Sequence, residues 1–153
     1  MADTYSQIFY HAIFAVRNRE SLITPRIKDN LYKYIGGIIN NQKQKLFIIN
    51  GVPDHVHLLL NCKPDVNLSS LIGEIKEHST KFINDQKIIR GKFYWQAGFG
   101  AFSVSKKEVG VVLNYIKQQE EHHKRKTFKE EYIELLKENE IDFKQDYIFE
   151  SVS

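Results

Sequence analysis

The chain contains GVPDHVHLLL at residues 51–60, a Gly/Pro turn followed by an apolar run that is typical of a β-strand. Because strand side chains alternate between faces, His55 and His57 project side by side from one surface and the apolar side chains enter the other. Neutral imidazole is common both as a metal ligand and as a buried residue. The spacing therefore allows two interpretations. Either both histidines bind one metal ion, or one histidine is buried and hydrogen-bonded and the other is exposed.

The segments before this run predict a hairpin and a central strand. Leu46 to Asn50 has the composition of a strand, and the turn at 51–54 is short enough to pair it with the histidine strand. Ser6 to Val16 is apolar on both faces, which is typical of a strand in the middle of a sheet. We interpret His11, within that strand, as a core histidine satisfied by a hydrogen bond.

Two amphipathic helices are expected between and after these strands. Thr24 as N-cap and Pro25 at the first helical position predict the start of one helix, and the other begins near Asn67. Both have apolar residues at helical spacing. These are Ile27, Leu31, Tyr34, Ile35 and Ile38 in the first helix, and Leu68, Leu71, Ile72, Ile75, Phe82 and Ile83 in the second.

The segment 93–105 alternates aromatic and small residues and ends as a strand. The resulting order βαββαβ predicts an α+β fold of the ferredoxin-like or RRM-like kind, with two helices on one face of a four-stranded antiparallel sheet. Nearby basic residues are Lys76, Lys81, Arg90 and Lys92. The aromatic segment is either a platform for stacking unpaired bases or a buried edge or dimer strand beside a solvated basic face.

A helix expected over residues 106–126, after a capping box at 105–108, carries the second half of the candidate chemistry. Tyr115 and Gln119 are four residues apart and so lie one turn above the other, with His122 continuing the row. Alone, such a pair usually marks a half-exposed helix face. Together with the histidine pair, a Gln amide oxygen would complete an open three-ligand metal site beside a phenol.

Residues 127–153 are expected to form a C-terminal helix, which opens with a capping box at 127–130, and a tail. His122 and His123 diverge by about 100° on a helix, so they are secondary candidates for a site. The basic run before the last helix either offsets a helix dipole or contacts phosphates. It consists of Lys124, Arg125 and Lys126. The tail ends in an aromatic patch that we expect to dock on the domain or on a partner, formed by Tyr147, Ile148 and Phe149.

Length and composition suit one domain with its own core. The chain has 153 residues, 42% hydrophobic and 27% charged, and a net charge of +3 that only weakly favours an anionic partner. The single Cys62 is compatible with a reducing compartment. We find neither a signal peptide nor an apolar run long enough for a membrane span, and we expect a cytosolic protein. No glycine-rich phosphate loop or cysteine pair for zinc is present in the sequence.

These motifs together resemble the single-tyrosine HUH transposases of bacterial insertion sequences, the IS200-like family, which includes transposases associated with repetitive extragenic palindromes (REP). The resemblance rests on GVPDHVHLLL, on NYIKQQEEHH at 114–123 and on KTFKEEY at 126–132, and it covers essentially the whole chain. Asp54 and Glu120 stand where the family pattern favours Asn and Pro, and neither is a catalytic position.

The resemblance implies that Tyr115 is the nucleophile and that His55, His57 and Gln119 are metal ligands. The implied reaction is cleavage and rejoining of single-stranded DNA through a 5′-phosphotyrosine intermediate. The implied cofactor is Mg²⁺ or Mn²⁺, with Zn²⁺ also compatible, and no nucleotide. The implied partners are hairpin ends of a mobile element and a second copy of the chain that shares its active sites, with the Phe99 to Val104 strand as the seam. The implied location is the bacterial cytoplasm, at the nucleoid.

The domain is thus expected to span residues 1–153, with a βαββαβ core at 1–105, the tyrosine helix at 106–126 and the C-terminal helix and tail at 127–153. Two other functions stay open. A non-catalytic RRM-like module would use the same sheet for stacking, and the two histidines and Gln119 would then not need to converge. An HUH replication initiator or relaxase would share the chemistry, but such proteins are usually larger.

Overall fold

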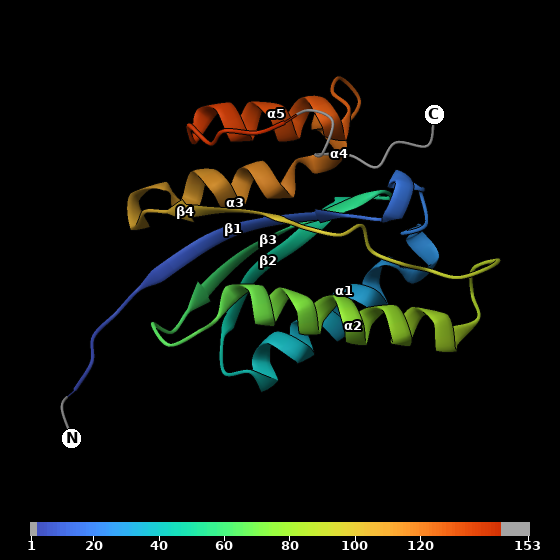
Figure 1. Ribbon diagram of the computed structural model, residues 1–153, viewed down its shortest axis with the longest axis horizontal. Coiled ribbons are helices and arrows are strands. Elements are labelled where there is room, and N and C mark those ends of the chain that lie inside the picture. The colour runs from blue at the N-terminus through green and yellow to red at the C-terminus, as the bar shows by residue number, and fades with distance from the viewer. Residues whose placement is uncertain (1–2, 145–153) are drawn as a thin grey trace.

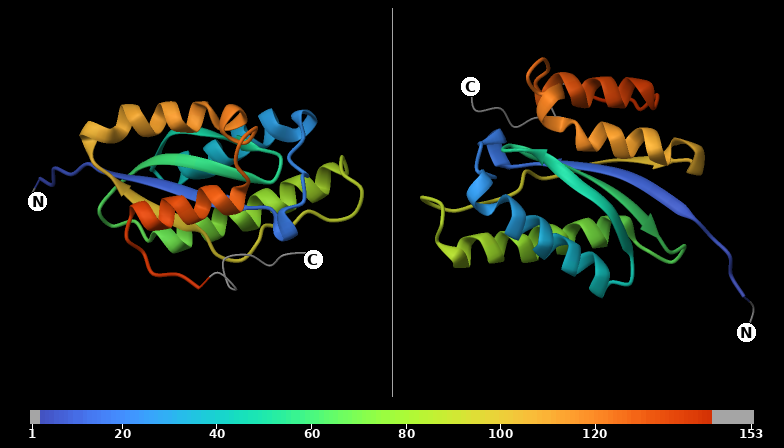
Figure 2. Two further views of the ribbon diagram at one scale, coloured as in Figure 1. Left: turned by 90° about the horizontal axis from the view of Figure 1, so that it is seen from above. Right: turned by 180° about the vertical axis from the view of Figure 1, so that it is seen from behind.

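The computed structural model describes residues 3–144 and has three layers, with a β-sheet between two sets of helices (Figure 1). The helices α1 and α2 cover one face of the sheet, and the later helices α3, α4 and α5 cover the other (Figures 1 and 2). The strands are β1 (Ile8–Ala15), β2 (Lys45–Val52), β3 (His55–Cys62) and β4 (Gly100–Val104). The α-helices are α1 (Pro25–Asn41), α2 (Leu68–Gln86), α3 (Val109–Lys117), α4 (Gln119–His122) and α5 (Phe128–Glu138), and the short 3₁₀ turns are η1 (Arg17–Arg19) and η2 (Lys106–Glu108).

The sheet confirms the predicted βαββαβ order and the α+β class. Its strand order is β2-β3-β1-β4, and every neighbouring pair is antiparallel. The histidine strand β3 is therefore an inner strand, paired with β2 through the predicted hairpin and with β1 on its other side. β4 lies at one edge of the sheet, where it could pair with a second copy of the chain. That it forms the dimer interface stays a prediction.

The two faces of β3 enter different cores, as the alternation in the sequence predicts. Val56, Leu58 and Leu60 are fully buried in the main core, which α1 and α2 complete. His55 and His57 are fully buried on the opposite face, where Glu131 of α5 contacts both. The interpretation with one exposed histidine is therefore wrong, because the C-terminal part of the chain covers this face.

Most of the aromatic segment at 93–105 is core rather than a stacking platform. Phe93 and Trp95 are buried against the main core, and the Trp95 Nε1–H donates to Ser79 Oγ at 2.9 Å. Phe102 of β4 is buried on the opposite face of the sheet, and Tyr94 is exposed. Apolar burial of these rings stabilises the domain and leaves few of them for bases.

The segment at 106–126 is not one continuous helix. It divides into η2, α3 and α4, and Gln118 between the last two has non-helical dihedral angles. Asn50 of β2 gives the physical reason, because its Nδ2 donates to the carbonyls of Ile116 at 2.9 Å and Lys117 at 3.2 Å. A side chain that donates to the last carbonyls of a helix replaces the backbone N–H groups of a further turn, so the helix can end there.

Three of the predicted helix starts are confirmed, and one is wrong in its capping. Asn67 caps α2, Pro25 opens α1, and the capping box of Thr127 and Glu130 at α5 is complete. The box predicted at 105–108 is wrong, because the Ser105 side chain makes no cap and the turn closes through the backbone instead. The aromatic patch at 147–149 lies outside the described residues. None of the helices in residues 3–144 is long and apolar enough to cross a membrane.

Gly51 is expected to be essential to the hairpin that carries the histidines. A Cβ at this position would lie 2.1 Å from the His55 carbonyl oxygen and 2.9 Å from Val56 Cα, both backbone atoms that cannot move independently. Gly51→Ala should lower the free energy of unfolding by about 3 kcal/mol, the upper end for overpacking. Gly37→Ala in α1 is the matched control, since its Cβ meets nothing within 4 Å and should be neutral or stabilising. Urea unfolding of both variants measures the difference, and equal stabilities would contradict the expected clash.

Candidate metal centre and tyrosine site

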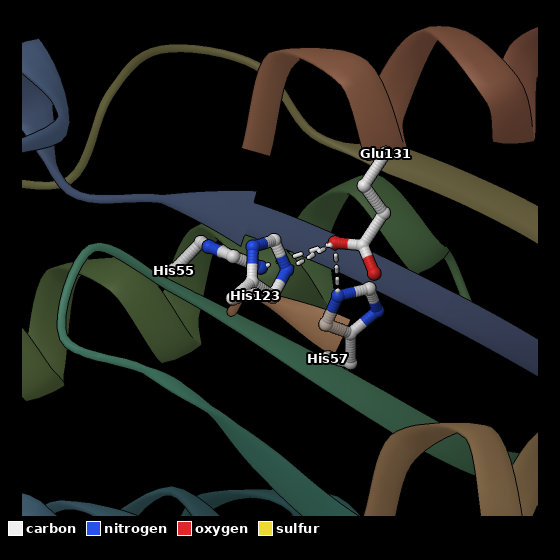
Figure 3. A group of neighbouring side chains, drawn as sticks. All are labelled: His55, His57, His123 and Glu131. Carbon is white, nitrogen blue, oxygen red and sulfur yellow. Dashed lines mark hydrogen bonds and ion pairs between the residues drawn. The ribbon is translucent and has the colours of Figure 1, made fainter. Parts of the chain in front are cut away.

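One buried carboxylate, that of Glu131 in α5, lies at the centre of the site (Figure 3). Its Oε1 lies 3.2 Å from His55 Nε2, 3.0 Å from His57 Nε2 and 3.0 Å from His123 Nε2. Glu131 is 3% exposed, and His55 and His57 are 0% exposed. Two buried imidazoles from β3 and the partly exposed imidazole of His123, directly after α4, thus surround one oxygen atom.

The second carboxylate oxygen of Glu131 contacts the two residues predicted on the tyrosine helix. The Tyr115 hydroxyl donates a hydrogen bond to Oε2, and Gln119 Nε2 donates to the same atom at 3.0 Å. Tyr115, Gln119, His55 and His57 therefore converge within a single chain, without the second copy that the resemblance implies as a partner in the site. Gln119 Oε1, the atom predicted as a ligand, is buried and has no hydrogen-bond partner among the described residues.

Glu131 is ionised in this environment. Burial alone would raise the pKa of its carboxyl, but hydrogen bonds from His123, His55 and His57 hold it well below the usual range. For His55, burial by itself lowers the pKa, because it disfavours the charged imidazolium. The contacts of His55 with Asp54 and Glu131 outweigh this effect, so its pKa is raised overall. Burial lowers the pKa of His57 to about 4, so that ring is neutral. The site thus holds the negative carboxylate of Glu131 next to His55, whose protonated form is favoured by the neighbouring carboxylates.

The phenol of Tyr115 is protonated in this state. Burial raises the pKa of Tyr115, and the negative charge of Glu131 raises it further. The Tyr115 ring packs against the His122 ring at 4.7 Å and the His57 ring at 5.8 Å between centroids. These contacts hold the hydroxyl at the cluster, and any increase in its nucleophilicity requires positive charge to offset that of Glu131.

The donor set fits a divalent metal ion. One ligand atom from each of His55, His57, His123 and Glu131 lies within 4.8 Å of all the others. Imidazole and carboxylate ligands suit Mn²⁺ and Zn²⁺, and the unpartnered Gln119 oxygen is a further donor beside them. Asp54 Oδ1 lies 2.6 Å from His55 Nδ1, the carboxylate contact that commonly orients a ligating histidine.

The sequence interpretation missed Glu131 and ranked His123 as secondary. The available signal is that Glu131 occupies the apolar stripe of the last helix, between Phe128 and Leu135 at helical spacing. A carboxylate in such a stripe is buried and needs partners. The prediction that His122 and His123 diverge agrees with the structure, because His122 packs on Tyr115 while His123 reaches Glu131.

A cleft of about 740 Å³ opens next to the cluster, between the η1 turn, the β2–β3 turn and the start of α5. Both Asp54 and His123 line it, so it borders the site directly. Its acidic members are Asp54, Glu120 and Glu130, and its basic members are Arg19, Lys124, Arg125 and Lys126, three of which the sequence predicts as DNA contacts.

The other predicted DNA contacts do not line this cleft. Lys76 is not part of a free basic face, because its Nζ donates to the carbonyls of Gln96 at 2.9 Å and Gly98 at 2.5 Å. Burial lowers the pKa of Lys76 to about 8. Lys81 pairs with Asp85 on α2, and Arg90 and Lys92 follow that helix, which covers the opposite face of the sheet (Figure 1).

Comparison with known protein families matches residues 4–119 to the family described as "Transposase IS200 like". The chain belongs to this family. The match confirms the resemblance and includes His55, His57, Tyr115 and Gln119. It ends before His123 and Glu131, so this IS200-like chain supplies the carboxylate from a segment beyond the matched range.

Characterised relatives are distant but cover most of the chain. The ISDra2 transposase TnpA of Deinococcus radiodurans is 24% identical over 118 residues, which is 74% of this chain and 84% of the relative. The transposase of insertion sequence IS200 from Salmonella typhimurium is 24% identical over 129 residues, or 81% of this chain and 84% of the relative.

Solved structures show the same fold. A transposase from Deinococcus radiodurans superposes with a TM-score of 0.62 at 22% identity, covering 78% of this chain and 95% of that one. A REP-associated tyrosine transposase bound to a REP hairpin gives a TM-score of 0.62 at 19% identity, covering 80% and 73% of the two chains. At these identities, the likeness supports the architecture of this IS200-like protein.

Proposed function

We propose that this IS200-like transposase cleaves and rejoins single-stranded DNA by transesterification, with Tyr115 as the nucleophile. The observation that carries the proposal is the convergence of Tyr115, Gln119, His55 and His57 on the Glu131 carboxylate. A phenol held beside a cluster that can bind a metal ion combines a nucleophile with the charge neutralisation that phosphoryl transfer needs. A module that only stacks bases would not need these side chains to meet.

The proposed reaction uses the chain's own groups for proton and bond transfer. Glu131 Oε2 already accepts a hydrogen bond from the Tyr115 hydroxyl, so it is placed to take that proton once positive charge at the site favours the phenolate. The Tyr115 oxygen then forms a bond to the DNA phosphorus, the bond to the 3′ oxygen breaks, and the leaving oxygen takes up the proton given up by Tyr115, so that a 5′-phosphotyrosine and a free 3′-hydroxyl result. Because the new bond conserves the energy of the phosphodiester, the reaction needs no nucleotide and is reversed by attack of a 3′-hydroxyl.

The proposed metal, Mn²⁺ or Mg²⁺, would be held by His55, His57, His123 and Glu131, with Gln119 Oε1 as a further ligand. When bound, it would neutralise phosphate oxygens and favour the phenolate. His55 would bind the metal through Nε2, and its Nδ1 contact with Asp54 fixes the orientation of the ring. Burial keeps His57 neutral and therefore able to bind a cation.

The cleft beside His123 is the proposed path of the strand, with Lys124 and Arg125 contacting phosphates. Replacing both by Gln should weaken binding of a single-stranded oligonucleotide by about tenfold and lower the salt slope of log K by about 1.4, the value for two lost phosphate contacts. Fluorescence anisotropy at several salt concentrations measures this. Lys81→Gln on α2 is the control and should bind normally. Equal losses in both proteins would place the strand elsewhere.

We also propose that the substrate includes hairpin ends, because one structural neighbour is bound to a REP hairpin. Such a substrate would place the protein with the DNA of the bacterial cytoplasm. A homodimer that pairs through the β4 edge is the proposed assembly. Light scattering of an active sample decides the last point, and a monomer that retains full cleavage activity would contradict it.

Formation of a covalent adduct tests the proposed function. Wild-type protein, Mn²⁺ and a labelled single-stranded oligonucleotide carrying the element's end should give a labelled band on a denaturing gel, and EDTA should remove it. A protein that binds the oligonucleotide and Mn²⁺ but forms no adduct would favour the RRM-like binding module. Nicking at a replication origin, without rejoining of element ends, would favour the initiator or relaxase.

A further inference from the structure

His11 of β1 makes a buried contact with the candidate ligand His57. His11 Nε2 lies 2.8 Å from His57 Nδ1, and the rings are stacked with centroids 5.0 Å apart. The register Ile13↔His57 between β1 and β3 places His11 diagonally across the ladder on the same face. His11 is 4% exposed and His57 is 0% exposed, so this hydrogen bond has no competition from water.

The donors and acceptors around His57 fix the direction of this bond. A carboxylate oxygen accepts hydrogen bonds, so His57 Nε2, at 3.0 Å from Glu131 Oε1, carries the hydrogen. A neutral imidazole has one N–H, so His57 Nδ1 is then a bare acceptor. His11 Nε2–H must therefore donate to it.

A metal ion bound at His57 Nε2 requires the hydrogen bond between His57 Nδ1 and His11 Nε2 to run in the opposite direction. The Nε2 lone pair must be free for the cation, so the hydrogen of His57 must reside on Nδ1 and point at His11 Nε2. The shared proton moves from His11 Nε2 to His57 Nδ1, His57 Nε2 releases one proton, and His11 Nδ1 takes up one. Both rings stay neutral, and the number of bound protons is unchanged.

We propose that His11 is a positioning residue for the metal centre, acting by exchanging donor and acceptor roles with His57 so that His57 can present Nε2 to the cation. The inference rests on the proposed function, because it concerns the same site. A side chain that both donates and accepts at the position of His11 Nε2 is required. Gln meets this requirement and Leu does not.

Mn²⁺ titration of the full chain, followed by electron paramagnetic resonance of the free ion, tests the proposal. His11→Leu should weaken Mn²⁺ binding by about ten- to a hundredfold, as for other partners of ligating histidines, while His11→Gln should stay within about threefold of wild type. Phe102→Leu is the matched packing control, because the Phe102 ring lies 5.8 Å from the His11 ring without a hydrogen bond to it. It should bind Mn²⁺ like wild type.

A spectroscopic measurement on wild type covers the case in which His11→Leu does not fold. Imidazole ¹⁵N–¹H spectra should show the shared hydrogen on His11 Nε2 without metal and on His57 Nδ1 with the diamagnetic probe Zn²⁺. Unchanged protonation of both rings on Zn²⁺ binding would overturn the inference, as would Mn²⁺ binding by His11→Leu equal to wild type or an equal loss in Phe102→Leu. Wild type that binds no metal would overturn the proposed metal centre together with this role.

Discussion

Tyr115→Phe is expected to abolish the covalent protein–DNA adduct while leaving the fold intact. The substitution removes only the hydroxyl that contacts Glu131, and the ring contacts with His57 and His122 remain. Loss of a nucleophile lowers the rate by at least about a thousandfold, because the remaining groups cannot form the covalent bond. The measurement is the labelled band on a denaturing gel with Mn²⁺ and a single-stranded oligonucleotide.

Tyr132→Phe is the matched control for this experiment. Tyr132 follows Glu131 directly in α5, and its ring packs against Phe128 at 5.4 Å between centroids. The variant should form the adduct at nearly the wild-type rate, since the Tyr132 hydroxyl lies against Gly100 of β4, where it would be 3.0 Å from a Cβ on that glycine. An adduct that persists in Tyr115→Phe and disappears in Tyr132→Phe would assign the nucleophile to the other tyrosine.

Glu131→Gln is expected to destabilise the metal-free protein by about 3 to 5 kcal/mol at pH 7, the range for removing one partner of a buried charged pair. The substitution preserves size but places an NH₂ group among side chains that now donate to a carboxylate. Since the folded pKa of Glu131 is depressed, its stabilisation is fully present above the unfolded value and declines as pH falls through the folded value. The difference between variant and wild type should therefore be largest near neutral pH and shrink in acid.

Urea unfolding at several pH values measures this difference, with Glu134→Gln as the control. Glu134 lies three residues further along α5 and pairs with Lys126 at the surface, where both side chains are about half exposed. Such a pair contributes about 0 to 1 kcal/mol. If Glu131→Gln were as stable as the control at pH 7, the carboxylate would not be the electrostatic centre of the site.

The histidine pair in β3 was predictable because its geometry depends on a short-range sequence pattern. Alternation in a strand places His55 and His57 on one face whatever surrounds them, and the turn at 51–54 fixes the hairpin. Helical spacing likewise places Tyr115 and Gln119 on one side of a helix, and the break at Gln118 does not separate them from the cluster. Local geometry suffices for each of these pairs.

The contacts that complete the site depend on where α5 packs. Burial of Phe128 and Leu136 against β1 and β4 brings Glu131 over the histidines, and no spacing rule relates residues 55 and 131. Asn50 ends α3 from another strand, and Lys76 is held by loop carbonyls 20 and 22 residues away. These interactions join segments that are distant in the chain, so they exist only after the layers have packed.

The sequence by itself determined the strand that presents two imidazoles, the helix face that presents a phenol and an amide, and the order of elements that forms the sheet. Periodicity, capping and turn chemistry are local properties, and they persist in any packing that buries the apolar faces. Only the tertiary structure decided that a glutamate from the last helix occupies the centre of the cluster and that His11 contacts His57 from the neighbouring strand. A buried charge or a buried N–H cannot bind water, so it must pair with a polar group that the fold places next to it. Which group that is depends on the packing of distant segments.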